Sequence, residues 1–296
     1  MSVLASLTAT ACFAMACTLL TDLDGLSDGA TAVGDAAGPD VRSDVSISSL
    51  DGSPDAHLDG GGDATRSPYV TAVLADSPLL YYRLGEPEGT PARDEVSGAT
   101  QPYPVQGVTL GTAGALAGEK DTAITLDGTG KIDLTQDTDF EGKLPFSVEA
   151  WVSRALTGGD GLGFLVDHEA WSNGRRGWDL RASPTGFSFE RSMTVDGGTS
   201  YNSASTDEAA VAGEWRHVVG TFDGTTMRLY VDAVRRDTYT ASISLSKLGV
   251  PFAVGKQNCT PCTSTGFYGA LDELAIYPRA LSEARIVVHY NAGKGL

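Results

Sequence analysis

The chain has 296 residues and a formal net charge of −17 at pH 7. Such a charge repels nucleic acids and other polyanions, so we expect no nucleic-acid partner. It suits a secreted protein, or one that binds cations or neutral ligands. The four cysteines form two pairs at opposite ends of the chain, Cys12 with Cys17 and Cys259 with Cys262.

Residues 1–20 are typical of an export signal. The run from Val3 to Leu20 is apolar and rich in small residues, although the chain has no Lys or Arg before Arg42. The tetrapeptide Ala14-Met15-Ala16-Cys17 is similar to a bacterial lipobox, so Cys17 is a candidate for lipidation. A plain cleaved signal peptide and the absence of any signal are the alternatives. We expect a secreted or cell-surface protein, with a lipid anchor on the outer face of a bacterial membrane as its only membrane contact.

Residues 21–67 are predicted to be a disordered linker rich in Asp, Gly and Ser. The segment contains ten Asp, two Arg, no Glu and no aromatic residue. Such a composition buries too little apolar surface to offset the chain entropy lost on folding. Its Asp-Gly pairs lack the twelve-residue spacing and closing Glu of an EF-hand loop. Subtracting its charge (−10 + 2 = −8) from −17 leaves −9 for residues 68–296.

Residues 68–296 read as one all-β domain. Short segments rich in β-branched and aromatic residues alternate with Gly and Asp turns, which is typical of an antiparallel sandwich. A short helical turn is expected at Val70–Asp76 and a helix from the N-cap Ser282 to about Gly293. Strands are expected at Leu79–Leu84, Thr122–Leu126, Lys131–Leu134, Phe146–Ser153, Phe164–His168, Trp178–Ala182, Phe187–Arg191, Trp215–Phe222, Met227–Val231, Arg236–Thr240, Phe252–Val254 and Tyr268–Tyr277.

Two strands show a clear alternation of side chains with period two. In the strand from Met227 to Val231, the alternation predicts one buried face and one wet face that carries Tyr230. In the strand from Phe146, an inner face is expected opposite a face that carries Glu149 and Trp151. His217, in the strand before Met227, is interpreted as a structural histidine.

Five segments in collinear order carry a family resemblance. They are VLADSPLLYYRLGE (73–86), DTAITLDG (121–128), PFSVEAWV (145–152), EWRHVVGTFDGTTMRLYVDAVRR (214–236) and GALDELAIYPRALSEARIVVHYNAG (269–293). Together they resemble the laminin-G-like branch of the concanavalin A-like lectin/glucanase superfamily, in the form found in bacterial surface proteins. The resemblance implies a jelly-roll sandwich of two curved antiparallel sheets that binds a glycan or an extracellular protein. Ala233 departs from the pattern, because a Gly usually completes the turn there.

The residues do not predict an enzyme. Glycoside hydrolysis needs two carboxylates at a fixed separation, and the glucanases of this fold carry them in a Glu-x-Asp-x-(x)-Glu pattern on one strand. The nearest match, Asp167-His168-Glu169, has Leu165 at the first position. We therefore expect a non-catalytic binding module. A structural or adhesive protein without a small-molecule site, and a divergent glycoside hydrolase, are the alternatives.

The resemblance also implies a structural calcium ion. Relatives hold the ion between an early loop, here residues 92–98, and the C-terminal Leu-Asp-Glu strand. Asp94 and Asp272 are the expected side-chain ligands, with the carbonyl of Gly98. The alternative is that Asp94 lies in a solvated turn and Asp272 only bonds a loop.

The remaining candidates are a disulfide and a ligand surface. Cys259 and Cys262 are expected to form a short-loop disulfide in an exported protein, with an unpaired or metal-bound pair as the alternative. Aromatic faces stack on sugars and planar polar groups bind their hydroxyls, which favours the polar loop around Trp171. The expected ligand-binding residues are Trp171, Asn173, Arg175 and Tyr201, and packing of these side chains is the alternative.

Overall fold

The computed structural model describes residues 66–296 except 135–139, 157–161, 173, 209 and 260–265. The predicted export signal with Cys17 and nearly all of the predicted linker lie outside the described residues, as do Asn173 and Cys262. Among the described residues, no helix has the length and apolar character needed to cross a membrane.

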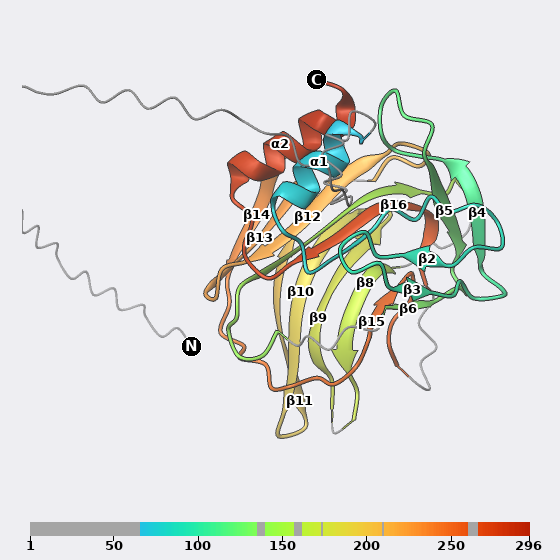
Figure 1. The fold of residues 1–296 in the computed structure, drawn as a ribbon. Coiled ribbons are helices and arrows are strands. Elements are labelled where there is room, and N and C mark those ends of the chain that lie inside the picture. The colour runs from blue at the N-terminus through green and yellow to red at the C-terminus, as the bar shows by residue number, and fades with distance from the viewer. Residues whose placement is uncertain (1–65, 135–139, 157–161, 173, 209, 260–265) are drawn as a thin grey trace, which may run out of the picture. The chain divides into compact units, whose positions relative to one another are not determined.

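Two antiparallel sheets form a sandwich, which confirms the predicted fold class (Figure 1). The eight-stranded sheet runs in the order β14 (Val234–Thr240), β13 (Thr226–Val231), β12 (Arg216–Phe222), β7 (Phe146–Arg154), β16 (Tyr268–Tyr277), β5 (Thr122–Asp127) and β4 (Val108–Ala113), and β1 (Leu80–Tyr82) also pairs with β16. The six-stranded sheet runs β11 (Gly198–Ser205), β10 (Gly186–Val195), β9 (Arg176–Ser183), β8 (Gly163–Ala170), β15 (Phe252–Val254) and β6 (Ile132–Leu134). A small pair of strands, β2 (Ala92–Arg93) and β3 (Thr100–Gln101), lies apart from both.

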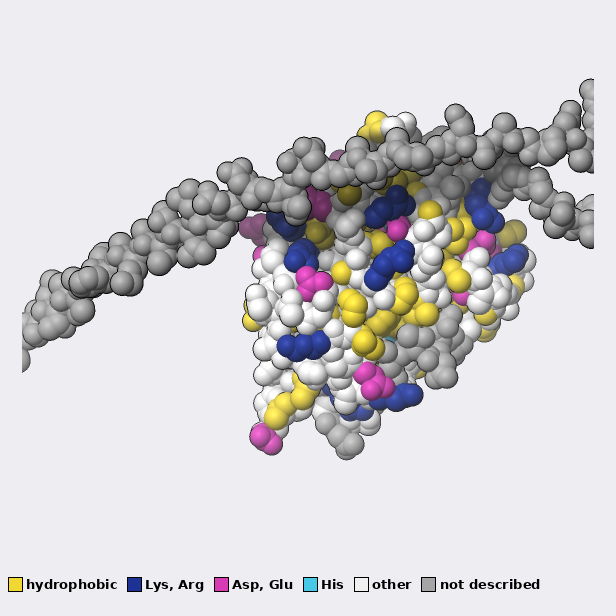
Figure 2. Space-filling model, turned by 60° about the vertical axis from the view of Figure 1, so that its left-hand side comes forward, with side chains coloured by type: hydrophobic (Ala, Val, Ile, Leu, Met, Phe, Trp, Pro, Cys, Tyr) yellow, Lys and Arg dark blue, Asp and Glu magenta, His cyan; other side chains and the backbone are white. Residues whose placement is uncertain are grey.

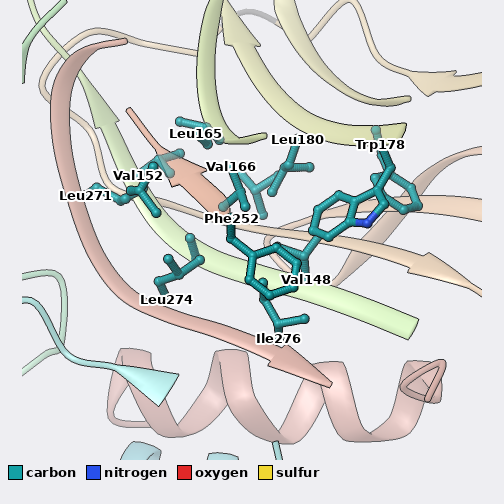
Figure 3. Close-up of a cluster of buried hydrophobic side chains, with 14 of the residues drawn as sticks. Val148, Val152, Leu165, Val166, Trp178, Leu180, Phe252, Leu271, Leu274 and Ile276 are labelled. Carbon is teal, nitrogen blue, oxygen red and sulfur yellow. The ribbon is translucent and has the colours of Figure 1, made fainter. Parts of the chain in front are cut away.

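The main hydrophobic core fills the space between the sheets. Val148 and Val152 of β7 face Trp178 and Leu180 of β9, with Phe252 of β15 beside them (Figure 3). These side chains are buried, which confirms the inner face predicted for β7. Burying each large apolar side chain contributes roughly 1.5–3 kcal/mol, so this core holds the two sheets in a fixed register.

The alternation in β13 predicted that the outer face of the eight-stranded sheet is wet, and this prediction is wrong for the part of the face that carries Tyr230. The helices α1 (Pro68–Ala75) and α2 (Glu283–Lys294) cover it (Figure 1). Trp151 and Tyr230 are buried there in a second apolar cluster with Val73 and Ile286. Alternation along a strand identifies which side chains share a face, but it cannot show that a distant helix covers that face.

A buried polar network joins the two helices to the sheet. Glu149 of β7 accepts hydrogen bonds from the hydroxyls of Tyr69 (3.2 Å) and Tyr277 (2.8 Å). The ring of His289 lies between two carboxylates, with Nδ1 3.0 Å from Glu149 Oε2 and Nε2 2.9 Å from Asp76 Oδ2. Ionised carboxylates only accept hydrogen bonds, so both ring nitrogens carry a proton and the ring is charged.

The charges in this network shift the pKa values of His289 and Glu149. Burial lowers the pKa of His289, but Glu149 and Asp76 outweigh burial and raise it above its ordinary value. Burial raises the pKa of Glu149, but His289 and His217 outweigh burial and hold it well below its usual range. The helix pair is therefore held on the sheet by a cation between two anions.

The turn between β13 and β14 explains the departure at Ala233. Val231 pairs with Val234, which leaves Asp232 and Ala233 as a two-residue turn with φ of 52° and 62°. Both values lie in the left-handed region, which a two-residue hairpin turn of this kind requires and which Gly adopts without cost. The chain therefore keeps the turn at the expense of strain at Ala233.

We expect Ala233→Gly to raise the free energy of unfolding by about 1 kcal/mol, because a left-handed residue with a Cβ costs about 1–2 kcal/mol. Denaturant unfolding measures the change. The control is Ala113→Gly, on the exposed end of β4 at an ordinary φ, which should lower stability by about 0.5–1 kcal/mol. Equal changes in the free energy of unfolding for the two variants would contradict backbone strain at Ala233.

We expect His289→Gln to lower the free energy of unfolding by about 3 kcal/mol near pH 6, because it leaves the fully buried Glu149 without the charged ring, whereas Asp76 keeps Arg279 and Arg285. The folded pKa of His289 is raised, so its stabilisation is complete below its ordinary pKa of 6.5 and is lost as the pH rises through the folded value. The loss caused by the variant should therefore shrink in alkaline solution. Chemical denaturation across pH measures it, with His57→Gln in the N-terminal segment as the control. If the difference in free energy of unfolding between the wild type and His289→Gln were constant from about pH 6 to pH 10, the ring of His289 would not be charged.

Candidate functional site

Strand register places acidic side chains side by side on the outer face of the six-stranded sheet. Asp167 of β8 pairs with Asp179 of β9, and Asp179 pairs with Glu190 of β10. Residues paired across antiparallel strands point to the same face, and their neighbours Trp178 and Leu180 point into the core. Asp167, Asp179 and Glu190, together with Glu169 two residues after Asp167, form what we call the acidic cluster.

Two arginines are paired with the acidic cluster. Arg175 places Nε 2.8 Å from both carboxylate oxygens of Glu169, and its terminal nitrogen donates to Asp179 (3.2 Å) and Glu190 (3.1 Å). Arg181 forms ion pairs with Asp179 and Glu190. Each guanidinium group is thus held by at least two carboxylates from different strands, and their positions are fixed.

Burial, repulsion and hydrogen bonds shift the pKa values of these carboxylates in different directions. Asp167, Glu169 and Asp179 are 0% exposed. Burial raises the pKa of Asp167, and the neighbouring charges of Glu169 and Asp179 raise it further. Burial also raises the pKa of Asp179, against the effect of Arg181. Burial opposes ionisation of Glu169 too, but hydrogen bonds from Arg175 outweigh it and lower the pKa of Glu169. The surroundings therefore favour the ionised form of Glu169 more than they favour the ionised forms of Asp167 and Asp179.

The same carboxylates form a group that could hold a metal ion. One oxygen from each of Asp167, Glu169 and Asp179 lies within 4.8 Å of the others. A donor set of oxygens alone suits hard cations such as Ca²⁺ and Mg²⁺. Asp167 accepts a hydrogen bond from the backbone N–H of Asn258 (2.9 Å) with one oxygen, and its Oδ2 has no hydrogen-bond partner within the described part of the chain.

Three of the predicted ligand-binding residues meet above the acidic cluster. The guanidinium of Arg175 lies 5.5 Å from the ring centroid of Trp171 and 5.1 Å from that of Tyr201. Trp171 follows β8 and is 38% exposed, and Tyr201 lies on β11 and is 49% exposed. We call these three residues the aromatic surface. Asn173, the fourth predicted residue, lies outside the described residues.

Sequence reasoning missed Asp179, Glu190 and the strand that carries Tyr201. The alternation of Trp178 and Leu180 with Asp179 and Arg181 was a signal for an acidic outer face. No sequence pattern shows that β8, β9 and β10 are neighbours in this register. The polar stretch Gly198–Ser205 forms β11 by pairing with Ser188–Val195 of β10, although it has few apolar residues.

The predicted calcium residues lie in different local settings. Asp94 is buried and its carboxylate accepts backbone hydrogen bonds from Tyr81 (2.8 Å), Val96 (3.2 Å) and Ser97 (3.2 Å). Gly98 adopts a φ of 73° and donates its N–H to the carbonyl of Asp94. These contacts close the loop on itself.

Asp272 lies where the register of β16 against β7 shifts. Its Oδ2 accepts the N–H of Ala115 (2.8 Å), and its buried Oδ1 has no hydrogen-bond partner in the described regions. Burial raises the pKa of Asp272, and the charge of Glu273 raises it further. Asp272 therefore has an oxygen free for a cation.

The pairing of Cys259 stays a prediction, because Cys262 lies outside the described residues.

A separate cavity of about 570 Å³ lies beside β4 and the loop before it. Its walls include Pro91, Pro102, Tyr103 and Leu110. The hydroxyl of Tyr103 donates a hydrogen bond to Glu86 (2.6 Å). Unlike Trp171 and Tyr201, Tyr103 is therefore not free to offer its polar edge to a ligand.

Comparison with solved structures shows which proteins share this fold. Two solved structures that the chain resembles are the ligand-binding domain of botulinum neurotoxin serotype D in complex with N-acetylneuraminic acid (17% identity, TM-score 0.54, 74% of this chain and 52% of that one) and the receptor-binding domain of botulinum neurotoxin type G (13% identity, TM-score 0.53, 72% and 51%). The chain spans about half the length of these structures. At such identities the likeness shows the fold alone. None of the curated proteins compared matches the chain.

A family model of the laminin-G type, described as the concanavalin A-like lectin/glucanases superfamily, matches residues 126–287. This region contains the four strands β8 to β11 that carry the acidic cluster and the aromatic surface. By sequence and by fold, the chain belongs to the concanavalin A-like lectin/glucanase superfamily.

Proposed function

We propose that residues 68–296 form a non-catalytic module that binds a carbohydrate on the aromatic surface outside the cell. The observation that carries this proposal is the pair of exposed rings, Trp171 and Tyr201, that both lie against the guanidinium of Arg175. Trp and Tyr combine a large apolar face with a polar edge, which suits a sugar ring that has apolar and hydroxyl-bearing sides. The fold is also seen with a sugar in the neurotoxin domain in complex with N-acetylneuraminic acid.

The fixed position of Arg175 supports binding at this surface. Its side chain is held by Glu169, Asp179 and Glu190, so little conformational freedom is lost when a ligand packs against the two rings. Ser192 (2.7 Å) and Gln257 (3.1 Å) donate hydrogen bonds to Glu169 and hold it in turn. A site held in this way is preorganised.

The burial of the carboxylates supports a non-catalytic role. A glycoside hydrolase must bring one acid and one nucleophile or base into contact with the scissile bond. The pKa values of Asp167, Glu169 and Asp179 are shifted in opposite directions, but all three side chains are 0% exposed, and Glu169 and Asp179 are paired with arginines. Their charges are used to fix the arginines beneath the aromatic surface.

The location outside the cell and the calcium ion are parts of the same proposal. We propose that residues 1–20 direct export, with Cys17 as the site of a lipid anchor, and that the acidic residues 21–67 form the spacer that carries the domain. We also propose a structural Ca²⁺ ligated by Asp272, with Asp94 and the carbonyl of Gly98 as further ligands. The buried oxygen of Asp272 without a hydrogen-bond partner in the described chain supports this choice.

We expect Trp171→Ala and Tyr201→Ala each to weaken binding to glycans on an array by roughly 30-fold, which corresponds to about 2 kcal/mol for an aromatic residue at the centre of an interface. The matched control is Tyr239→Ala, which removes an aromatic residue of similar exposure from β14 of the other sheet. Circular dichroism checks that all three variants fold.

Two results would contradict this prediction. Equal binding by all four proteins would exclude the aromatic surface, and the absence of glycan binding together with retained binding to a surface protein would favour the adhesive alternative. Release of free sugar from a bound polysaccharide, lost in Glu169→Gln, would overturn the non-catalytic role.

We expect Ca²⁺ at 100 times its dissociation constant to raise the free energy of unfolding by about 2.7 kcal/mol, because the ion binds the folded state alone. Thermal unfolding with Ca²⁺ and with EDTA measures the effect. Asp272→Asn should abolish it, and Asp167→Asn should leave it intact. The reverse result would move the ion to the acidic cluster, and an unchanged wild-type melting temperature would exclude a calcium site.

A further inference from the structure

The charge beneath the aromatic surface restricts which sugars it can accept. Four carboxylates face two guanidinium groups in the acidic cluster, so full ionisation gives a local charge of −2 (−4 + 2). If Asp167 and Asp179 both hold protons, the local charge is 0. Neither state leaves a positive charge for an anionic ligand.

The arginines of this face have no unpaired charge to offer. Arg175 contacts Glu169, Asp179 and Glu190, and Arg181 contacts Asp179 and Glu190. A sugar carboxylate could bind Arg175 only by displacing one of these buried partners, which would leave that partner buried without its cation. Breaking a buried ion pair in this way is strongly unfavourable.

Arg176, the residue after Arg175, does not supply a cation for an anionic sugar on this face. It donates a hydrogen bond to the carbonyl of Ser172 and pairs with Met193, which packs against the core. Gly177 pairs with Ser192 on the outer face, and successive side chains of a strand point to opposite faces. Arg176 therefore belongs to the other face. Residues 68–296 as a whole carry a charge of −9, which adds to the repulsion of anions.

We infer that the aromatic surface selects neutral saccharides and rejects sialylated, uronic and sulfated ones, and that Glu190 is the residue that keeps Arg175 and Arg181 from binding an anionic sugar. This inference rests on the proposed carbohydrate-binding function. Glu190 is the cluster carboxylate with measurable exposure, at 9%, and it contacts both arginines. It therefore determines specificity by holding the arginines, and it need not touch the sugar.

The test is an array of neutral oligosaccharides, each printed beside its sialylated or sulfated derivative. The wild-type domain should bind the neutral member of each pair at least fivefold more tightly, as like charges separated by several ångströms in a partly aqueous setting imply. Raising the salt concentration from 50 mM to 500 mM should narrow this difference, because salt screens exposed charges. The salt series needs no variant and so does not depend on how a substitution folds.

A variant tests the assignment to Glu190. Glu190→Gln keeps the shape of the side chain and removes one negative charge, so the ratio of anionic to neutral binding should rise about fivefold. The control Glu283→Gln removes the same charge from α2, where the side chain is 56% exposed, and should leave the ratio unchanged. An equal change in the two variants would assign the selectivity to net charge and overturn the role of Glu190.

The outcomes separate the inference from the function on which it rests. Wild-type binding to sialylated or sulfated glycans at or above the level of their neutral partners would overturn the inference while supporting carbohydrate binding. Binding to no glycan of either kind would overturn the carbohydrate-binding function and the selectivity with it.

Discussion

The register of the six-stranded sheet is the constraint on which both the core and the candidate site depend. In β9, Trp178 and Leu180 point into the core, so Asp179 and Arg181 must point outward. A slip of one residue would bury the charges against the other sheet and expose the indole. Apolar packing on one face of the sheet therefore fixes the positions of the charged residues on the other face.

The domain stabilises buried charge on both of its outer faces by the same means. Over the eight-stranded sheet, the imidazolium of His289 lies between Asp76 and Glu149 and holds two helices in place. Over the six-stranded sheet, Arg175 lies among three carboxylates and carries two aromatic rings. Partners from distant parts of the chain satisfy each charge. The aromatic residues over the helix-covered network, Tyr69 and Trp151, are buried, whereas Trp171 and Tyr201 beside the other network are exposed.

The family contains both lectins and glucanases, and the burial of the carboxylates is the observation that bears on the choice between these two roles in this chain. The carboxylates of a hydrolase must touch the substrate, but here they are held inside a network of ion pairs. The groups exposed beside the cluster are an indole and a phenol. In the proposed function, the buried acidic cluster supports these two rings and sets the charge beneath them.

Local pattern in the sequence determined most of the strands, the inner face of β7 and the C-terminal helix, because alternation and turn chemistry act between near neighbours. It also brought Trp171, Arg175 and Tyr201 forward as candidates. Only the tertiary structure decided that these three meet, that Asp179 and Glu190 lie beside Asp167, and that helices cover Trp151 and Tyr230. The physical reason is that strand order and helix docking come from the packing of segments far apart in the chain, which no short-range pattern records.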